Sequence, residues 1–485
     1  MTDTVKGSLL VLLCCIGCST VNDEEGTWSV YKADKESSSY SPLEQINKEN
    51  VKKLKSIWTF RPNDASEGTN FSRSESNPIV IDGIMYTTSA RHRLYALNAR
   101  DGTRIWSFDP FDGGRGGGVS RGVTYWEDGN DKRILFTAGD QLFAVNAGTG
   151  KPIATFGNKG KVSMNVGLRG DPSTISVIPT SPGIVYKNLL ILGAEVSELY
   201  GAEPGYIRAY DIQSGELEWT FHTIPKPGEI GYETWPIDAW KYAGGVNDWA
   251  GMSVDEERQM VFLALGSPSY DFYGADRKGE NLFGNCVVAL NAGNGEYIWH
   301  FQTIHHDLWD YDLPAPPNLV TIERDGKKID AVAQTSKIGF LYVLDRETGE
   351  PLFPVVEKEV PASNIPGEQA WPTQPYPLKP EPYARQFITK DDLKYYSQTS
   401  YDSLIKAFSS YRYEGLFTPP DTIGTFVLPG TRGGSSWGGG AFDPATGILY
   451  VKSNDSPEIN LLKKIVPRNE TAEASSLYEQ GEKFY

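Results

Sequence analysis

A short segment recurs five times along this chain, and it constrains the fold more than any other feature of the sequence. Each copy has an apolar strand, Asn or Asp, a Gly-centred turn, and a second strand that closes on Trp or another large residue. The turn glycines are Gly102, Gly150, Gly215, Gly295 and Gly349. The closing residues are Trp106, Phe156, Trp219, Trp299 and Phe353. Recurrence at this spacing predicts an architecture built from one repeated supersecondary unit.

Further strand candidates lie between the copies, so each unit supplies about four short strands. They cover residues 78–87, 133–138, 184–193, 259–266 and 332–344. Helical periodicity is confined to residues 390–408. Four strands per unit predict a β-propeller, whereas a β-helix or another solenoid would need shorter and more even repeats. We expect the closing tryptophans Trp106, Trp219 and Trp299 to pack between neighbouring blades as scaffold.

Composition narrows the function classes. The chain is 39% hydrophobic and 12% aromatic, which is enough apolar surface to bury a core and excludes a disordered protein. The formal net charge of -16 argues against a nucleic-acid partner. Beyond the N-terminus, no stretch reaches the ~18 consecutive apolar residues of a membrane span.

The N-terminal residues 1–17 are expected to be an export signal, with Lys6, an apolar run over 9–15 and Gly17 before Cys18. The sequence Cys-Ile-Gly-Cys at 15–18 resembles a bacterial lipobox, which implies lipidation of Cys18 and a tether over 18–27. An ordinary cleaved signal is the alternative. The expected location is the bacterial periplasm, with the protein anchored to a membrane through Cys18 alone, or the cell surface.

Cysteine usage agrees with this. Three of the four cysteines lie in or at the end of the signal, which leaves Cys286 in the body of the chain. A disulfide within the mature chain, a zinc site built on cysteines and a thiol nucleophile are therefore not expected. Cys286 stands in an apolar run and is predicted to be a small buried hydrophobic residue.

The densest departure from the repeat is the segment His-His-Asp-Leu-Trp-Asp-Tyr-Asp at residues 305–312. Two imidazoles and three carboxylates in eight residues allow two interpretations. The segment could be a hydrogen-bonded loop between blades. It could also form a hard-metal or general-base site, since carboxylate oxygens bind ions such as Ca²⁺ and a carboxylate can accept a substrate proton.

The repeat together with Trp-Asp-Tyr-Asp at 309–312 resembles the quinoprotein dehydrogenases. These are eight-bladed propellers that hold pyrroloquinoline quinone (PQQ) and a divalent ion on the propeller axis. Segments 302–310 and 413–420 are similar to the branch that contains membrane-type quinoprotein glucose dehydrogenase. The resemblance covers residues 28–467 and implies an all-β, eight-bladed propeller fold, with about six blades in this chain.

The resemblance also implies roles for single residues. Asp310 matches the catalytic carboxylate that takes the substrate hydroxyl proton, and Lys337 matches the catalytic cation beside the quinone oxygens. Trp249 matches the ring stacked on PQQ, and Arg121 matches the arginine that faces a PQQ carboxylate. The metal ligands implied are Glu198, Asp310 and Ser267. Ca²⁺ is the expected ion, with Mg²⁺ or a lanthanide as alternatives.

The implied function is oxidation of a sugar, polyol or related alcohol, with electrons passed to a cytochrome c or a quinone acceptor. The adjacent-cysteine disulfide of alcohol-oxidising relatives has no counterpart, which favours the sugar and polyol branch. Gly116, Gly117 and Gly118 stand where glucose enzymes carry a substrate-contacting histidine, which argues against glucose. The alternative is a propeller lipoprotein that acts as a non-enzymatic scaffold, or an inactive fragment of a dehydrogenase.

The C-terminal residues 468–485 resemble the first helix of a cytochrome c domain, just before its haem-binding motif. The expected final blades do not follow residues 441–451. These features lead to the expectation of a shortened chain whose closing blades and haem domain are missing. A polar C-terminal tail is the alternative.

Overall fold

The computed structural model describes residues 28–64, 73–114, 116–175, 177–395 and 397–463. The expected signal over 1–17, the tether with Cys18 and the tail over 468–485 lie outside the described residues. Among the helices that are described, none has the length and apolar character needed to cross a membrane.

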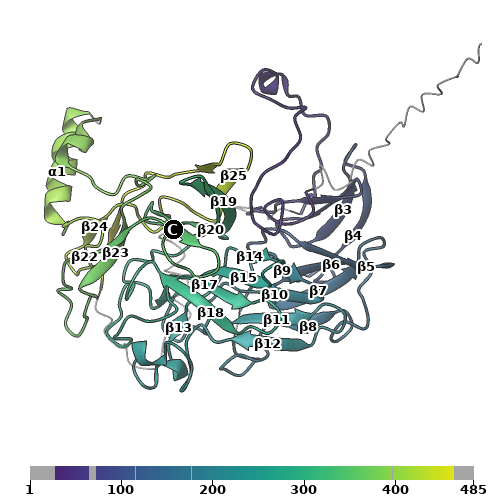
Figure 1. Cartoon of the computed structure of the whole chain (residues 1–485), viewed down its shortest axis with the longest axis horizontal. Helices are drawn as coiled ribbons and strands as arrows, with labels where there is room; N and C mark the ends of the chain where they lie inside the picture. Colours follow the sequence, from purple (N-terminus) through teal and green to yellow (C-terminus); the bar gives the residue numbers. More distant parts are fainter. Residues whose placement is uncertain (1–27, 65–72, 115, 176, 396, 464–485) are drawn as a thin grey trace, which may run out of the picture.

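Antiparallel sheets, arranged side by side around an axis, make up most of the structure (Figure 1). Within the described residues, four sheets have four strands each. The first contains β1 (Ile79–Ile81), β2 (Ile84–Thr88), β3 (Leu94–Asn98) and β4 (Arg104–Phe108). The second contains β5 (Thr124–Asp128), β6 (Asp131–Ala138), β7 (Gln141–Asn146) and β8 (Lys161–Ser163). The third contains β9 (Ile184–Tyr186), β10 (Leu189–Leu192), β11 (Ile207–Asp211) and β12 (Leu217–Phe221). The fourth contains β14 (Ser253–Asp255), β15 (Met260–Ala264), β17 (Cys286–Asn291) and β18 (Tyr297–Gln302).

The remaining sheets are smaller. Three strands, β19 (Asn318–Arg324), β20 (Lys327–Thr335) and β21 (Leu341–Asp345), form the fifth sheet. Two-stranded pairs are formed by β13 (Gly244–Gly245) with β16 (Pro268–Ser269), β22 (Val355–Glu359) with β23 (Thr373–Pro377), β24 (Thr425–Val427) with β27 (Glu458–Asn460), and β25 (Gly440–Asp443) with β26 (Ile448–Val451). The four complete sheets, the fifth sheet and the β25–β26 pair account for the expected all-β propeller of about six blades.

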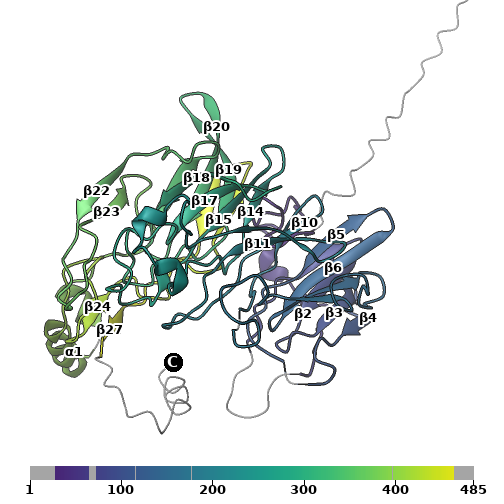
Figure 2. The same ribbon diagram turned by 90° about the horizontal axis from the view of Figure 1, so that it is seen from below.

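Helical structure is sparse. The four short 3-10 turns are η1 (Val51–Lys53), η2 (Tyr232–Thr234), η3 (Ala239–Lys241) and η4 (Lys390–Tyr395), counted over the residues that the structure describes. The helix predicted over 390–408 is found as η4 followed by α1 (Gln398–Ser410). Ser397 caps α1, since its side chain accepts a hydrogen bond from the Ser400 N–H. In Figure 2, α1 lies at the opposite side of the molecule from the first sheet.

The hydrophobic core is divided among the interfaces between neighbouring sheets. Ile191 and Ile207 of the third sheet pack with Val261 and Val288 of the fourth, and all four side chains are fully buried. Because both faces of such a sheet are covered, its inner strands are largely apolar rather than alternating, as β15 and β17 show. Cys286 belongs to this core and is a free thiol, which confirms its prediction as a buried hydrophobic residue.

Each closing tryptophan packs on the turn glycine of the next sheet. A Cβ placed on Gly150 would lie 2.5 Å from the Trp106 ring, and one on Gly349 would lie 2.5 Å from the Trp299 ring. Trp219 covers Gly295 in the same way. These glycines have φ near +70 to +75, a left-handed conformation that glycine adopts without strain. The prediction that the tryptophans are scaffold between blades is confirmed.

Strand direction sorts the loops into two ends. In a sheet of four antiparallel strands, the loop entering the first strand and the loop joining the second and third strands lie at one end. The repeat turns, which join the third and fourth strands, lie at the other end. Contacts between β5 and β9, β9 and β14, and β14 and β19 show that the first strand is the innermost one in the second to fifth sheets.

Candidate active site

All of the predicted site residues within the described structure stand at the first of these two ends. Arg121, Trp249 and Asp310 precede the innermost strands β5, β14 and β19. Glu198, Ser267 and Lys337 lie between the second and third strands of their sheets. Side chains from distant parts of the sequence therefore meet because the antiparallel connectivity brings their loops to the same end.

The centre of the site is a lysine between two aspartates. Lys337 Nζ lies 2.7 Å from Asp310 Oδ1 and 3.0 Å from Asp312 Oδ2. All three side chains are largely buried. Although burial opposes it, the two carboxylates raise the pKa of Lys337, so the ammonium stays charged. The structure thus brings together Asp310 and Lys337, the two residues that the resemblance implies to be catalytic.

The two aspartates differ in their surroundings. Burial raises the pKa of Asp310 well above its usual value, and Asp312 and Glu198 add to the rise. Asp312 accepts hydrogen bonds from the Ser267 N–H at 2.7 Å and from Trp249 Nε1 at 3.1 Å. Although burial opposes it, these donors and Lys337 lower the pKa of Asp312. Asp310 is thus the carboxyl group suited to carry a proton, and Asp312 is a fixed anion.

Asp307 holds the loop that presents Asp310. Its side chain accepts hydrogen bonds from the main-chain N–H groups of Trp309 at 2.7 Å and Tyr311 at 2.8 Å. The Ser267 hydroxyl donates to the same carboxylate at 2.5 Å. Asp310 has a φ of 59, a left-handed conformation that few non-glycine residues adopt, so the loop is fixed at the point where it aims Asp310.

Arg121 and two tryptophan rings form the neighbouring part of the site. The Arg121 guanidinium lies 5.1 Å from the centre of the Trp249 ring and 5.3 Å from the centre of the Trp437 ring. Its Nη1 donates to Thr180 Oγ1 at 2.8 Å and to the Trp249 carbonyl at 3.2 Å. The Ser181 hydroxyl also donates to the Trp249 carbonyl, at 2.8 Å. Cation, hydroxyl groups and a partly exposed flat ring therefore converge at Trp249.

Two buried atoms in this part of the site lack hydrogen-bond partners among the described residues. They are Arg121 Nε and Glu75 Oε2, which form an ion pair with each other at 3.1 Å without hydrogen-bond geometry. A planar polycarboxylate such as PQQ fits this set, because an arginine and hydroxyls suit its carboxylates and Trp249 offers a flat surface.

The predicted metal ligands lie near one another without forming a closed site. Burial and the charge of Asp312 raise the pKa of Glu198. Burial and the charges of Asp310 and Glu198 raise that of Asp271. Several carboxylates around one lysine leave excess negative charge, which favours a cation. Across the described part of the chain, however, no three acidic, histidine or cysteine side chains converge as a ready metal site. The metal remains a prediction.

Sequence reasoning missed Asp271, Thr180 and Ser181, and it left Asp307 without an assigned role. The segment 305–312 has features of both interpretations, the hydrogen-bonded loop between blades and the site for a metal or general base. His306 bonds Glu368 through Nε2 at 3.0 Å and is buried, so it ties loops together rather than facing the site. Asp310 and Asp312, by contrast, face Lys337. Local spacing carries no signal for Thr180 and Ser181, whose partner Arg121 is about 60 residues away.

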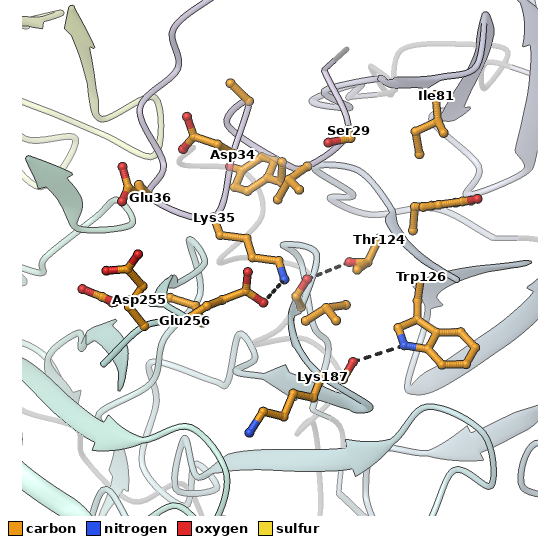
Figure 3. A pocket seen from close by; sticks show the side chains of 18 of the residues that line it. Ser29, Asp34, Lys35, Glu36, Ile81, Thr124, Trp126, Lys187, Asp255 and Glu256 are labelled. Carbon is orange, nitrogen blue, oxygen red and sulfur yellow. Dashed lines mark hydrogen bonds and ion pairs between the residues drawn. The ribbon is translucent and has the colours of Figure 1, made fainter. Parts of the chain in front are cut away.

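A cavity of about 1320 Å³ opens at the other end of the sheets (Figure 3). Residues 29–36, the β1–β2 turn and the β9–β10 turn contribute to its walls. Lys35 bonds Glu256 across it at 2.6 Å, and Trp126 Nε1 donates to the Lys187 carbonyl at 3.1 Å. None of the predicted site residues lines this cavity. We place the candidate site at Lys337 because the convergent charges lie there.

Comparison with known proteins agrees with this geometry. The family described as PQQ: glucose/ethanol/alcohol dehydrogenase, beta-propeller domain, matches residues 28–484. The chain belongs to this PQQ dehydrogenase family. Quinoprotein glucose dehydrogenase of Escherichia coli (strain K12) is 34% identical over 482 residues, which cover 93% of this chain and 58% of that protein. Quinate/shikimate dehydrogenase (quinone) of Acinetobacter baylyi is 32% identical over 87% of this chain and 56% of that protein.

Solved structures show the same fold. Quinohemoprotein alcohol dehydrogenase from Comamonas testosteroni superimposes with a TM-score of 0.66 at 26% identity, over 89% of this chain and 58% of that one. A europium-containing methanol dehydrogenase reaches a TM-score of 0.66 at 23% identity over 89% of this chain and 69% of that one, which supports the fold alone. The chain spans less than two thirds of the length of the curated relatives named above.

Proposed function

We propose that this protein is a PQQ- and metal-dependent dehydrogenase that oxidises the hydroxyl group of a sugar, polyol or related alcohol. The observation that carries the proposal is the buried Asp310–Lys337–Asp312 cluster beside the Trp249 and Arg121 platform. A scaffold protein would have no use for a lysine buried between two carboxylates beside an arginine that lies over a partly exposed flat ring. Membership of the dehydrogenase family supports the same conclusion.

Each residue of the site has a separate proposed role. PQQ, when bound, supplies the two-electron acceptor. Trp249 would hold it through the face of its ring, and Arg121 would hold it through a carboxylate. Asp310 takes the proton of the substrate hydroxyl at its carboxylate, which Lys337 contacts at Oδ1. Asp312 keeps Lys337 and the Trp249 indole in fixed positions through its own contacts with them.

The remaining assignments concern the ion and the partners. Glu198 and Asp310 would supply carboxylate oxygens to a Ca²⁺ ion, with Mg²⁺ or a lanthanide as alternatives, and Ser267 would stand beside it. The ion would act as a Lewis acid on the quinone carbonyl. A cytochrome c or a quinone is the proposed electron acceptor. The proposed location is the bacterial periplasm, with Cys18 as the lipid anchor.

The substrate is proposed to be a sugar or polyol other than glucose. Gly116, Gly117 and Gly118 present no side chain where the resemblance expects a histidine, and this supports a differently shaped substrate site. Relatives are named for glucose, quinate and glycerol, which shows that one fold accepts several hydroxyl compounds. The common chemistry is an alcohol carbon that loses a hydride while its hydroxyl group loses a proton.

The test is turnover of the purified protein with added PQQ and Ca²⁺, followed by dye reduction across a panel of sugars, polyols and alcohols. We expect the wild type to be active and Asp310→Asn to lose at least about 100-fold in kcat, since general-base catalysis contributes about 10²–10⁴-fold. Asp101→Asn, an exposed aspartate in a repeat turn, is the matched control and should be unchanged. Absence of both PQQ binding and metal-dependent turnover would leave the scaffold alternative standing.

A further inference from the structure

Residues 28–42, which we call the strap, carry a lysine that the proposed chemistry does not use. The strap turns sharply at Val30–Ala33, where the Ala33 N–H donates to the Val30 carbonyl at 3.0 Å. Lys32 has a φ of 64 and Ala33 a φ of 83, so both adopt the left-handed region. The Ser39 N–H donates to the Lys32 carbonyl at 2.8 Å, which fixes the turn from the other side. The backbone therefore holds Lys32 in one place.

The Lys32 side chain runs into the interior beside Trp437. Only 7% of the residue is exposed. Its Nζ donates to the carbonyls of Gly438 at 2.8 Å and Trp437 at 3.1 Å. The ammonium also lies 5.4 Å from the centre of the Trp437 ring, the same ring that the Arg121 guanidinium contacts at 5.3 Å. Lys32 and Arg121 thus share one aromatic partner at the edge of the site.

The Lys32 ammonium has no counter-ion in the described structure. Its hydrogen bonds end on main-chain carbonyls, and no described carboxylate lies within ion-pair distance of it. Burial, and then the nearby Arg121 charge, lower the pKa of Lys32 to about 8. At neutral pH the group is still mostly protonated. A buried cation beside a second cation is costly unless an anion neutralises it.

A second lysine of the strap, in contrast to Lys32, has a counter-ion. Lys35, three residues along, lies at the cavity of Figure 3 and forms an ion pair with Glu256 at 2.6 Å. Lys35 is therefore neutralised by the protein itself, whereas Lys32 is not. The two lysines belong to the same segment, so a difference in PQQ affinity between their variants cannot come from the strap as a whole.

We propose that Lys32 is a cofactor-binding residue, which together with Arg121 provides the positive charge that binds carboxylate groups of the cofactor beside Trp437. This inference rests on the proposed function, because PQQ is the anion it requires. It assigns a charge to the cofactor site from the N-terminal strap, a segment that contributes none of the residues implied by the family resemblance.

The test is direct binding of PQQ to the full chain at fixed Ca²⁺, measured by quenching of tryptophan fluorescence. Lys32→Met removes the charge and keeps the apolar stem, and we expect the Kd to rise about 10- to 100-fold, the range for a lost charge-assisted hydrogen bond. Lys32→Arg keeps the charge and should recover most of the affinity. Lys35→Met is the matched control and should leave the Kd within twofold of the wild type.

Lys32→Gly is the control for misfolding, because glycine adopts the left-handed φ of this position without strain. Lys32→Gly should unfold in urea at or above the wild-type midpoint while binding PQQ as weakly as Lys32→Met. If Lys32→Met binds PQQ as tightly as the wild type, the role of Lys32 is refuted and the proposed function stands. If the wild type itself does not bind PQQ, the proposed function and the inference fail together.

Discussion

At Lys337, one buried ammonium serves two carboxylates that have opposite proton affinities. Asp312 has two further hydrogen bonds, one from the Ser267 N–H and one from Trp249 Nε1, and these keep it ionised. Asp310 has Lys337 as its hydrogen-bond donor and is otherwise governed by burial. The difference in proton affinity thus follows from local donors rather than from residue type. Pairs of this kind separate a group that exchanges protons from one that anchors the site.

Replacement of Lys337 tests this arrangement at the level of one side chain. Lys337→Met would leave two carboxyl groups buried side by side without their cation, and we expect a loss of about 3–5 kcal/mol in the free energy of unfolding. Urea denaturation at pH 7 measures it. Lys132→Met is the control, since Lys132 pairs with Glu127 on the surface, where such pairs contribute about 0–1 kcal/mol. Equal losses of unfolding free energy in the two variants would show that the buried cluster stabilises the fold no more than a surface ion pair does.

At the scale of the elements, the contact between a closing tryptophan and the next turn glycine couples neighbouring sheets. Gly150→Ala would force a methyl group into the Trp106 ring, 2.5 Å away, at a φ of +70. Gly129→Ala is a matched control, because Gly129 has a φ of +58 and open space around its Cα. We expect Gly129→Ala to cost about 1 kcal/mol from backbone strain alone and Gly150→Ala about 2–4 kcal/mol. The urea midpoints of the two variants measure this difference. Similar midpoints would contradict a packing role for the contact between Gly150 and Trp106.

A second coupling joins the fourth and fifth sheets through Asp255. Arg346, which follows β21, donates from Nη1 to Asp255 Oδ2 at 3.0 Å and from Nη2 to the Val320 carbonyl at 3.0 Å. Asp255→Ala leaves the buried guanidinium without this carboxylate partner, and we expect a loss of about 1–3 kcal/mol in unfolding free energy. Glu347→Ala is the control, since exposed Glu347 pairs with Arg258 of the same network and should cost less than about 1 kcal/mol.

The same pair predicts a pH dependence. Although burial opposes it, hydrogen bonds from Arg258 and Arg346 lower the pKa of Asp255 in the folded state. A carboxylate with a lowered folded pKa stabilises the fold above its unfolded value, about 3.9, and this stabilisation fades as the pH falls through the folded pKa. The gap in unfolding free energy between wild type and Asp255→Ala should therefore be constant from pH 5 to 7 and shrink below about pH 4. A gap that is independent of pH would exclude an ionised Asp255.

The repeat made the fold predictable, and the loops show where prediction from sequence ends. Strand positions and the packing of Trp106 or Trp299 follow from local periodicity, which every copy repeats. The site residues Asp310, Lys337 and Trp249 were reached through a family resemblance, because their mutual contacts depend on loops that are far apart in sequence. Lys32 had no such signal. Its burial and lack of a counter-ion arise only when the strap is folded into the interior.

At the scale of the whole molecule, the proposed site and the repeat turns occupy opposite ends of the same sheets. The repeat turns with their glycines lie at one end, while Arg121, Trp249 and Asp310 precede the first strands of three different sheets at the other. A ligand bound at that end contacts several blades at once. Binding should therefore stabilise the ring of sheets against separation, in addition to enabling chemistry.

Thermal unfolding tests this coupling. Ligand at about 100 times its Kd stabilises a protein by about 2.7 kcal/mol, and a protein of this size shifts its Tm by about 1 °C per kcal/mol. We therefore expect PQQ with Ca²⁺ to raise the Tm by about 3 °C, and Trp249→Ala to lose this increment because it removes the platform. Trp126→Phe is the matched control: Trp126 lies at the cavity of Figure 3, where its indole donates to Lys187, so the variant should melt earlier yet keep the full increment. If both tryptophan variants lose the increase in Tm, the effect of the ligand depends on the overall stability of the protein. The site beside Lys337 would then not be its cause.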